Sequence, residues 1–236
     1  MSEPKRYAVI GGSSGMGFGL ARLIVERGDK VVIGGRDAER LADAVSRLGA
    51  SAEGYVVDSG HQAGLAEFFG RLSDLSGLFT PGASYATPMF RDGEPDAAKA
   101  LFDAKFWGQY WTVHTALAAL RPDAAVVLMS GTASVRPTGS SAYAACNAAI
   151  EGLGRALARE LAPLRVNTLS PGMIDSELWR NRPAELRNPM VETWRQRTLI
   201  GRPGTVEEAA AAAAFLLDNG NITGSTIYLD GGWTFR

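Results

Sequence analysis

The chain has 236 residues, of which 46% are hydrophobic and 21% are charged, and this size and balance suit one compact domain with a well-covered core. The net charge of -1, without a block of like charges, argues against nucleic acid or an anionic membrane as a partner. One cysteine excludes an internal disulfide, and with only two histidines no metal site is expected. No secretory signal, transit peptide or membrane span is readable, so the expected location is the cytoplasm.

Short β-branched runs alternate with helical patterns along the chain. The predicted strands are Tyr7–Ile10, Lys30–Ile33, Gly54–Val57, Gly77–Thr80, Ala124–Met129, Arg165–Leu169 and Thr226–Leu229. The predicted helices are one that ends at Arg27, then Ala38–Leu48, Gln62–Leu72, Ala97–Leu120, Ala142–Leu161 and Val206–Leu217. Continuous apolar strands separated by helices favour a parallel sheet covered on both faces. The sequence therefore predicts an α/β fold over residues 1–236: a single-domain, Rossmann-type, doubly wound parallel sheet of about seven strands with helices on both faces.

The stretch from Asp175 to Thr205 interrupts this alternation. It contains two tryptophans, three prolines and many arginines. A segment of this length between regular elements is often an active-site lid, and the alternative is a pair of surface helices that packs against the core. We expect a substrate lid near residues 175–205.

A glycine-rich turn, GGSSGMG over residues 11–17, follows the first predicted strand and opens the first helix. Gly11 permits a tight turn, and Gly15 and Gly17 let the backbone approach a pyrophosphate, which gains from the N–H groups and dipole of the helix N-terminus. The strand–turn–helix context favours a dinucleotide site. The alternative is a turn that needs glycine only for positive φ.

The spacing of this turn, G-x-x-x-G-x-G, resembles that of the short-chain dehydrogenase/reductase family, although Ile10 stands where the family has threonine. Further motifs occur in the order typical of the family. They are Arg165-Val166-Asn167, Ser170-Pro171-Gly172, Gly201-Arg202-Pro203-Gly204, Glu207-Glu208-Ala209, Thr223-Gly224 and Asp230-Gly231-Gly232. The resemblance covers nearly the whole chain, and it implies a nicotinamide cofactor and an oxidoreductase that acts on CH–OH or C=O groups.

Carried over to matching positions, the resemblance implies a set of cofactor-binding residues that surrounds the nucleotide. They are Gly11, Ser13, Ser14, Gly15, Met16, Gly17, Arg36, Asp58, Gly82, Asn147, Pro171, Gly172, Ile174 and Ser176. In the family, the position of Asp58 contacts adenine. Ile174 would reach the carboxamide through its backbone, and Ser176 would donate to the carboxamide or a phosphate.

The end of the second predicted strand indicates which cofactor is used. An NAD site places a carboxylate there to accept from the ribose 2′-hydroxyl. Here the position is Gly35, and Arg36 follows it. A guanidinium suits a 2′-phosphate, so we expect NADP(H). The alternative is that Arg36 is a solvated residue at the helix start, paired with Asp37 or Glu39.

Ser130 ends the fifth predicted strand, and Tyr143 lies at the start of the next helix, at the spacing that the family has. The resemblance implies that the serine hydroxyl polarises the substrate oxygen. The tyrosine passes a proton to or from that oxygen while hydride moves to or from the nicotinamide. This acid–base role needs a phenol with a lowered pKa, and a nearby cation lowers it best.

The usual cation is missing from its place. The family has Y-x-x-x-K, whereas this chain has Tyr143-Ala144-Ala145-Cys146-Asn147. The family's fourth catalytic residue is an asparagine on the preceding long helix, and here Lys105 stands at that position. We hypothesise a compensating exchange, in which Lys105 brings its ammonium to Tyr143 and Asn147 keeps the ribose or a water. The alternative is that Lys105 is solvated and the catalytic cation is lost.

Two functions follow from these alternatives. The first is NADP(H)-dependent hydride transfer to or from the carbonyl or alcohol of a small to medium, partly apolar substrate, bound by 84–91, 132–136 and the lid residues Leu178, Trp179, Met190 and Trp194. The second is a catalytically weak or inactive NADP(H)-binding sensor or regulatory protein. Trp107 and Trp111 lie one turn apart on a helix by which family members commonly associate, which fits a homo-oligomer (a dimer or tetramer) or a core position.

Overall fold

The structure is a computed structural model that describes residues 3–82, 86–137 and 139–236. Seven strands within these ranges form one parallel sheet: β1 (Arg6–Ile10), β2 (Lys30–Gly35), β3 (Ala52–Val56), β4 (Leu75–Thr80), β5 (Leu120–Met129), β6 (Arg165–Pro171) and β9 (Thr226–Leu229). Their order is β3-β2-β1-β4-β5-β6-β9. The order reverses between β1 and β4, where a doubly wound sheet leaves a crevice at the carboxyl ends of its strands.

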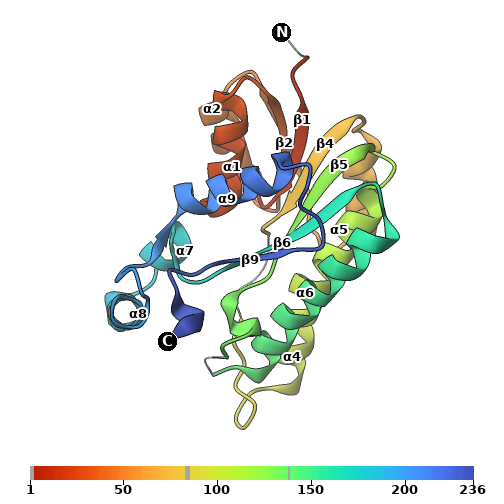
Figure 1. The fold of residues 1–236 in the computed structure, drawn as a ribbon. Coiled ribbons are helices and arrows are strands. Elements are labelled where there is room, and N and C mark those ends of the chain that lie inside the picture. Colours follow the sequence, from red (N-terminus) through yellow and green to blue (C-terminus); the bar gives the residue numbers. More distant parts are fainter. Residues whose placement is uncertain (1–2, 83–85, 138) are drawn as a thin grey trace.

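Helices cover both faces of the sheet (Figure 1). On one face lie α1 (Gly15–Glu26), α2 (Ala38–Leu48) and α9 (Val206–Asp218). On the other lie α3 (Gln62–Gly70), α5 (Gly108–Ala116) and α6 (Ser141–Glu160). The predicted fold, a doubly wound parallel sheet of the Rossmann type, is therefore confirmed.

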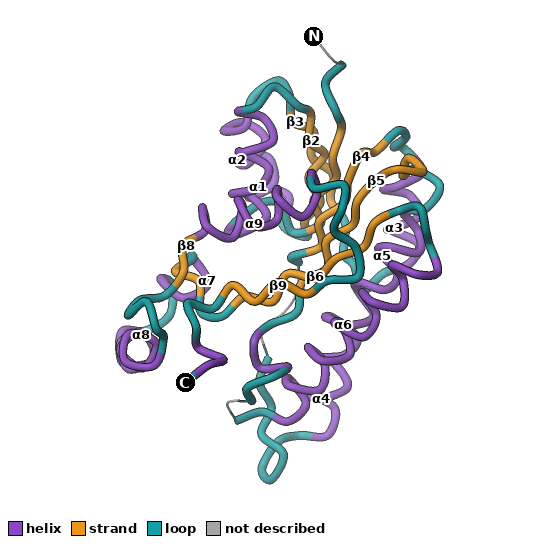
Figure 2. Tube along the Cα trace, viewed as in Figure 1, coloured by secondary structure: helices purple, strands orange, loops and turns teal. Residues whose placement is uncertain are grey.

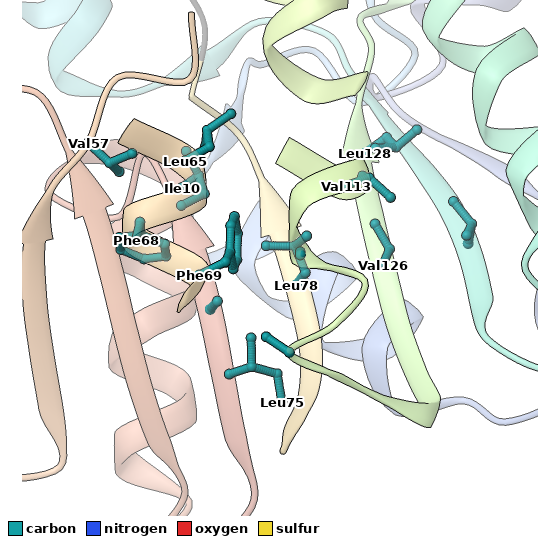
Figure 3. Packing of buried hydrophobic residues seen from close by; sticks show 14 of the residues in the cluster. Ile10, Val57, Leu65, Phe68, Phe69, Leu75, Leu78, Val113, Val126 and Leu128 are labelled. Atoms are coloured by element: carbon teal, nitrogen blue, oxygen red, sulfur yellow. The ribbon is translucent and has the colours of Figure 1, made fainter. Parts of the chain in front are cut away.

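The strands are buried on both faces, and successive residues of β1 show this directly. Tyr7 and Val9 belong to the core under α1, α2 and α9, whereas Ala8 and Ile10 belong to the core under α3, α5 and α6. This two-residue alternation is why the strand sequences are continuously apolar. Figure 3 shows the second of these cores, where Phe69 of α3 lies beside Leu78 of β4 and Phe68 lies nearer to Ile10 and Val57.

The predicted single helix over Ala97–Leu120 is wrong in two respects. The segment is α4 (Pro95–Phe102), a π-helical turn over Asp103–Trp107, and α5, which ends at Ala116. Leu120 belongs to β5 and pairs with Leu75, because sheet pairing prevails over the helical composition around it. Lys105 lies within the π-turn, and such turns are frequent at functional sites.

The interrupted stretch after β6 folds into small elements at one end of the sheet (Figure 2). A two-stranded sheet joins β7 (Ile174–Asp175) to β8 (Gly204–Thr205), and between them lie α7 (Glu177–Arg180) and α8 (Ala184–Arg197). Short 3-10 turns occur at Thr132–Ser134 and Trp233–Phe235. In the part of the chain that the structure describes, none of the helices has the length and apolar character needed to span a bilayer.

Candidate active site

A cavity of about 790 Å³ opens at the carboxyl ends of β1, β4 and β5. Ser130, Tyr143 and Lys105 all line it. Thirteen of the predicted cofactor residues line it as well: Gly11, Ser13, Ser14, Gly15, Met16, Gly17, Arg36, Asp58, Gly82, Pro171, Gly172, Ile174 and Ser176. Residues from the whole length of the chain thus converge on one space of the size that small-molecule sites have.

The glycine-rich turn forms the floor of this cavity, and its glycines are required by close backbone contacts. Gly11 has φ +95°, and a Cβ added there would lie 2.6 Å from the Gly82 Cα. A Cβ on Gly17 would lie 2.1 Å from the Gly11 carbonyl oxygen. The turn therefore makes close backbone contact with the segment that follows β4 on one side and with the start of α1 on the other.

The same turn presents a cradle for an anion. A Cβ added to Gly15 would meet no described atom within 4 Å, so the cavity reaches its backbone. Ser14 is the N-cap of α1, and its side chain makes no capping hydrogen bond with a described residue. The first N–H groups of α1 thus lack a side-chain partner, which is the arrangement that binds phosphate at a helix N-terminus. These residues fit the pyrophosphate of a dinucleotide.

The end of β2 is the place where the sequence predicts the nucleotide ribose to bind. A Cβ added to Gly35 would lie 3.2 Å from the Ser13 hydroxyl, which leaves little room for a larger side chain at this position. Arg36 is exposed and lines the cavity. Asp37 caps α2 by accepting from the Arg40 N–H at 3.0 Å, and its carboxylate lies 4.0 Å from the Arg40 guanidinium. Asp37 therefore pairs with Arg40, and among the described residues no ion pair joins Arg36 to an acid.

Lys105 points inward from the π-helical turn and is only 3% exposed. Its Nζ donates to the Ser130 carbonyl at 3.1 Å and lies 3.5 Å from the Tyr143 hydroxyl. It also lies 4.8 Å from the centre of the Tyr143 ring, at cation–π distance. Burial lowers the Lys105 pKa to about 8, because desolvation disfavours the ammonium.

Tyr143 is held at the first turn of α6. The N-cap residue Ser140 accepts from the Tyr143 N–H at 3.2 Å, and its own hydroxyl donates to the Pro88 carbonyl at 2.6 Å. This cap fixes where the helix begins and hence where the phenol points. Burial raises the Tyr143 pKa above its usual value, and the Asn147 side chain opposes part of the rise.

Asn147 is fully buried and lies behind the cavity wall. Its Nδ2 donates to the Tyr143 carbonyl at 2.8 Å, one turn back along α6. Its Oδ1 is buried without a hydrogen-bond partner among the described residues, and it would lie 3.1 Å from a Cβ added to Gly131. Asn147 is thus absent from the described lining of the cavity that holds the other predicted site residues.

Two buried polar residues at this site were missing from the sequence prediction. Gln109 of α5 accepts from the Thr80 hydroxyl and the Met129 N–H, each at 2.8 Å, and donates to the carbonyls of Met129 and Lys105. It joins the ends of β4 and β5 to the π-turn. The Glu151 carboxylate of α6 accepts a hydrogen bond from the Ser130 hydroxyl at 3.0 Å.

The opposite end of the cavity is aromatic and basic. Trp194 of α8 stacks on Trp233 near the C-terminus, with ring centres 4.3 Å apart. The Arg136 guanidinium lies over the Trp233 ring and also donates to the Trp233 carbonyl. The predicted lid residues Leu178, Trp179 and Met190 line the same end. Of the other predicted substrate segments, 132–136 borders the cavity, whereas 84 and 85 in 84–91 lie outside the described residues.

Comparison with known proteins identifies this arrangement. A sequence model of the family described as enoyl-(acyl carrier protein) reductase matches residues 10–234. The chain belongs to the short-chain dehydrogenase/reductase family. It is therefore an oxidoreductase, and the family resemblance noted in its sequence motifs is confirmed.

Members of the short-chain dehydrogenase/reductase family resemble the chain in sequence and in structure. An uncharacterised relative from Sinorhizobium fredii is 31% identical over 98% of this chain, which spans only 43% of that protein. Galactitol 2-dehydrogenase (L-tagatose-forming) of Cereibacter sphaeroides is 30% identical, with 96% of this chain and 94% of that enzyme covered. A small-chain dehydrogenase crystallised in complex with NADPH superposes with a TM-score of 0.83 at 28% identity, over 99% of this chain and 100% of that one.

Proposed function

We propose that the chain is a cytoplasmic NADP(H)-dependent oxidoreductase that moves hydride between the nicotinamide and the carbonyl or alcohol of a small to medium, partly apolar substrate. The observation that carries this proposal is the position of Lys105: its Nζ is buried in the cavity wall, 3.5 Å from the Tyr143 hydroxyl. A cationic side chain has thus been retained beside the tyrosine, although it comes from another helix. This favours an enzyme over a sensor that has lost its lysine.

The bound nicotinamide supplies or accepts the hydride. Tyr143 gives a proton to the substrate oxygen during reduction and takes it back during oxidation. The Ser130 hydroxyl holds the same oxygen. Burial raises the Tyr143 pKa. In this proposal the Lys105 ammonium, 3.5 Å from the hydroxyl, favours the phenolate by Coulomb attraction and works against that rise. Asn147 fixes the first turns of α6 through the Tyr143 carbonyl. Its Oδ1 is buried behind the cavity wall without a described partner, so we assign it a buried water and not the ribose.

The segment 175–205 acts in this proposal as the substrate lid. Trp179, Met190 and Trp194 give the far end of the cavity its apolar and aromatic character. We also propose a homo-oligomer, a dimer or tetramer. Trp107, at the end of the π-helical turn, is 41% exposed and stacks on Trp111 of α5 with ring centres 6.1 Å apart, so this part of the fold offers an aromatic surface to a second copy.

Turnover with a panel of aliphatic and aromatic ketones, aldehydes and the matching alcohols tests the function. We expect substrate-dependent NADPH oxidation with carbonyl compounds, or NADP reduction with alcohols. A Tyr143→Phe variant is the matched control, because it keeps the ring and removes only the hydroxyl. Tight NADPH binding without turnover of any compound would favour the sensor instead.

Replacing Arg36 with alanine tests the cofactor preference. Removing charge-assisted hydrogen bonds to the 2′-phosphate should weaken NADPH binding by about 10- to 100-fold and leave NADH binding unchanged. Fluorescence titration of both cofactors measures this. Arg47→Ala is the control, because Arg47 lies on α2, pairs with Asp43 at 3.4 Å and is not among the described residues that line the cavity. Wild-type protein that binds NADH as tightly as NADPH would contradict the preference.

A further inference from the structure

The Glu151 carboxylate forms a buried hydrogen-bond cluster directly behind Ser130. Glu151 lies in the middle of α6 and is only 5% exposed. Among the described residues, hydroxyl groups from Ser130, Ser134 and Ser170 approach its Oε1 at 3.0, 2.5 and 3.2 Å. The Tyr228 hydroxyl donates to its Oε2 at 2.9 Å.

This cluster joins four parts of the fold to α6. Ser130 follows β5, Ser134 belongs to the 3-10 turn after it, Ser170 lies in β6 and Tyr228 in β9. A buried carboxylate is costly unless hydrogen-bond donors satisfy its oxygens. An ionised carboxylate only accepts hydrogen bonds, so a set of hydroxyl donors is the partner set that suits it.

The cluster bears on the reaction because Ser130 belongs both to it and to the cavity wall. The Ser130 hydroxyl lies 3.0 Å from the Glu151 carboxylate and 3.0 Å from the Asn147 carbonyl, and both acceptors are atoms of α6. A serine side chain otherwise rotates among three staggered positions. Contacts with α6 therefore select the position from which Ser130 faces a bound substrate.

We propose that Glu151 is a positioning residue, which holds the Ser130 side chain in one rotamer against α6. When a carbonyl compound binds, the Ser130 hydroxyl turns about its Cβ–Oγ bond and donates its one proton to the substrate oxygen beside Tyr143, while Ser134 and Ser170 still donate to Glu151 Oε1. This inference rests on the proposed oxidoreductase function. Glu151 does not touch the substrate and is not among the described residues that line the cavity. It acts through Ser130.

Kinetics of Glu151→Gln and Glu151→Leu test the proposal, with the carbonyl compound that the wild-type protein reduces fastest. We expect kcat to fall about tenfold or more in Glu151→Leu, which corresponds to the loss of one hydrogen bond to a charged group, and to fall less in Glu151→Gln, whose amide oxygen still accepts from Ser130; the Kd for NADPH should be unchanged in both. Glu151→Gln keeps the size of the side chain if the leucine variant folds poorly. Tyr228→Phe is the matched control: it removes a hydroxyl from the other oxygen of the same carboxylate, at a residue of β9 outside the described cavity lining, and should keep kcat within about twofold.

A double-mutant cycle separates positioning from a general structural role. If Glu151 acts through Ser130, Glu151→Gln has no further effect on kcat once Ser130 is alanine. If the double variant lowers kcat by the product of the two single-variant factors, the two residues act independently, and this result would overturn the proposal.

Crystal structures of the wild-type protein and Glu151→Leu give a second test that needs no turnover. The proposal expects the Ser130 side chain to leave its wild-type rotamer in the leucine variant. An unchanged Ser130 would overturn the proposal even if the variant lost activity. Failure of every carbonyl compound with the wild-type protein would count against the proposed function, and the structures would still decide the role of Glu151.

Discussion

Lys105→Met should lower kcat about a hundredfold, toward the lower end of what a positioned proton-transfer group contributes. The ammonium lies 3.5 Å from the Tyr143 hydroxyl, inside the distance over which a charge shifts a pKa. Methionine fills a similar volume without the charge. Because a buried ammonium is costly, the variant should be at least as stable as wild type at neutral pH, so denaturant unfolding separates lost chemistry from lost fold.

The pH dependence of the same variant gives a sharper test. Burial lowers the Lys105 pKa to about 8, so its charge is present below that pH and is lost as the pH rises through it. Turnover that depends on the ammonium therefore falls as the pH rises past about 8 in the wild-type enzyme, and this fall should be missing in Lys105→Met. In Lys105→Arg the charge persists to much higher pH, so any activity that survives should not fall there. A methionine variant with the wild-type pH–rate profile would remove Lys105 from the mechanism.

The exchange between Lys105 and Asn147 was predictable as a hypothesis, but its geometry was not. Aligned motifs show that the two residue types have changed places, whereas the reach of Lys105 depends on the π-helical turn over Asp103–Trp107. No residue in that turn distinguishes it from an ordinary helix. Within this turn Lys105 contacts Ser130 and Tyr143, residues far away in the sequence, and local helix propensity does not record such contacts.

The strands and the glycine-rich turn were predicted well because their signals are local. Strands buried on both faces are continuously apolar, and a turn that needs close backbone approach must use glycine. The sequence pattern that points to Glu151 is weaker. It continues the row of Tyr143 and Asn147 at four-residue steps along α6, so the sequence places a charge on the helix face that bears the proposed proton donor Tyr143. No local sequence pattern indicates that Trp233 belongs to the site, because its stack on Trp194 joins segments that are far apart in the chain.

Gly17→Ala should abolish measurable NADPH binding and destabilise the fold by about 1–3 kcal/mol or more, the cost of forcing an atom into a packed site. Its Cβ would lie 2.1 Å from the Gly11 carbonyl oxygen and 2.8 Å from the carbonyl carbon. Both are backbone atoms, so either the turn or the start of α1 must move. Cofactor titration and denaturant unfolding measure the two effects. Gly70→Ala is the control, because no described atom lies within 4 Å of its Cβ and its φ is not positive.

Gly15→Ala separates the cradle from the packing of the turn. Its φ of +52° costs an alanine roughly 1–2 kcal/mol, yet its Cβ would meet no described atom. The side chain would instead enter the cavity over the N-terminus of α1. If a pyrophosphate lies there, Gly15→Ala should lose NADPH affinity beyond what its modest loss of stability explains. Full NADPH affinity in Gly15→Ala would mean that the phosphates lie elsewhere and that Gly11 and Gly17 serve only the packing of the turn against β4 and α1.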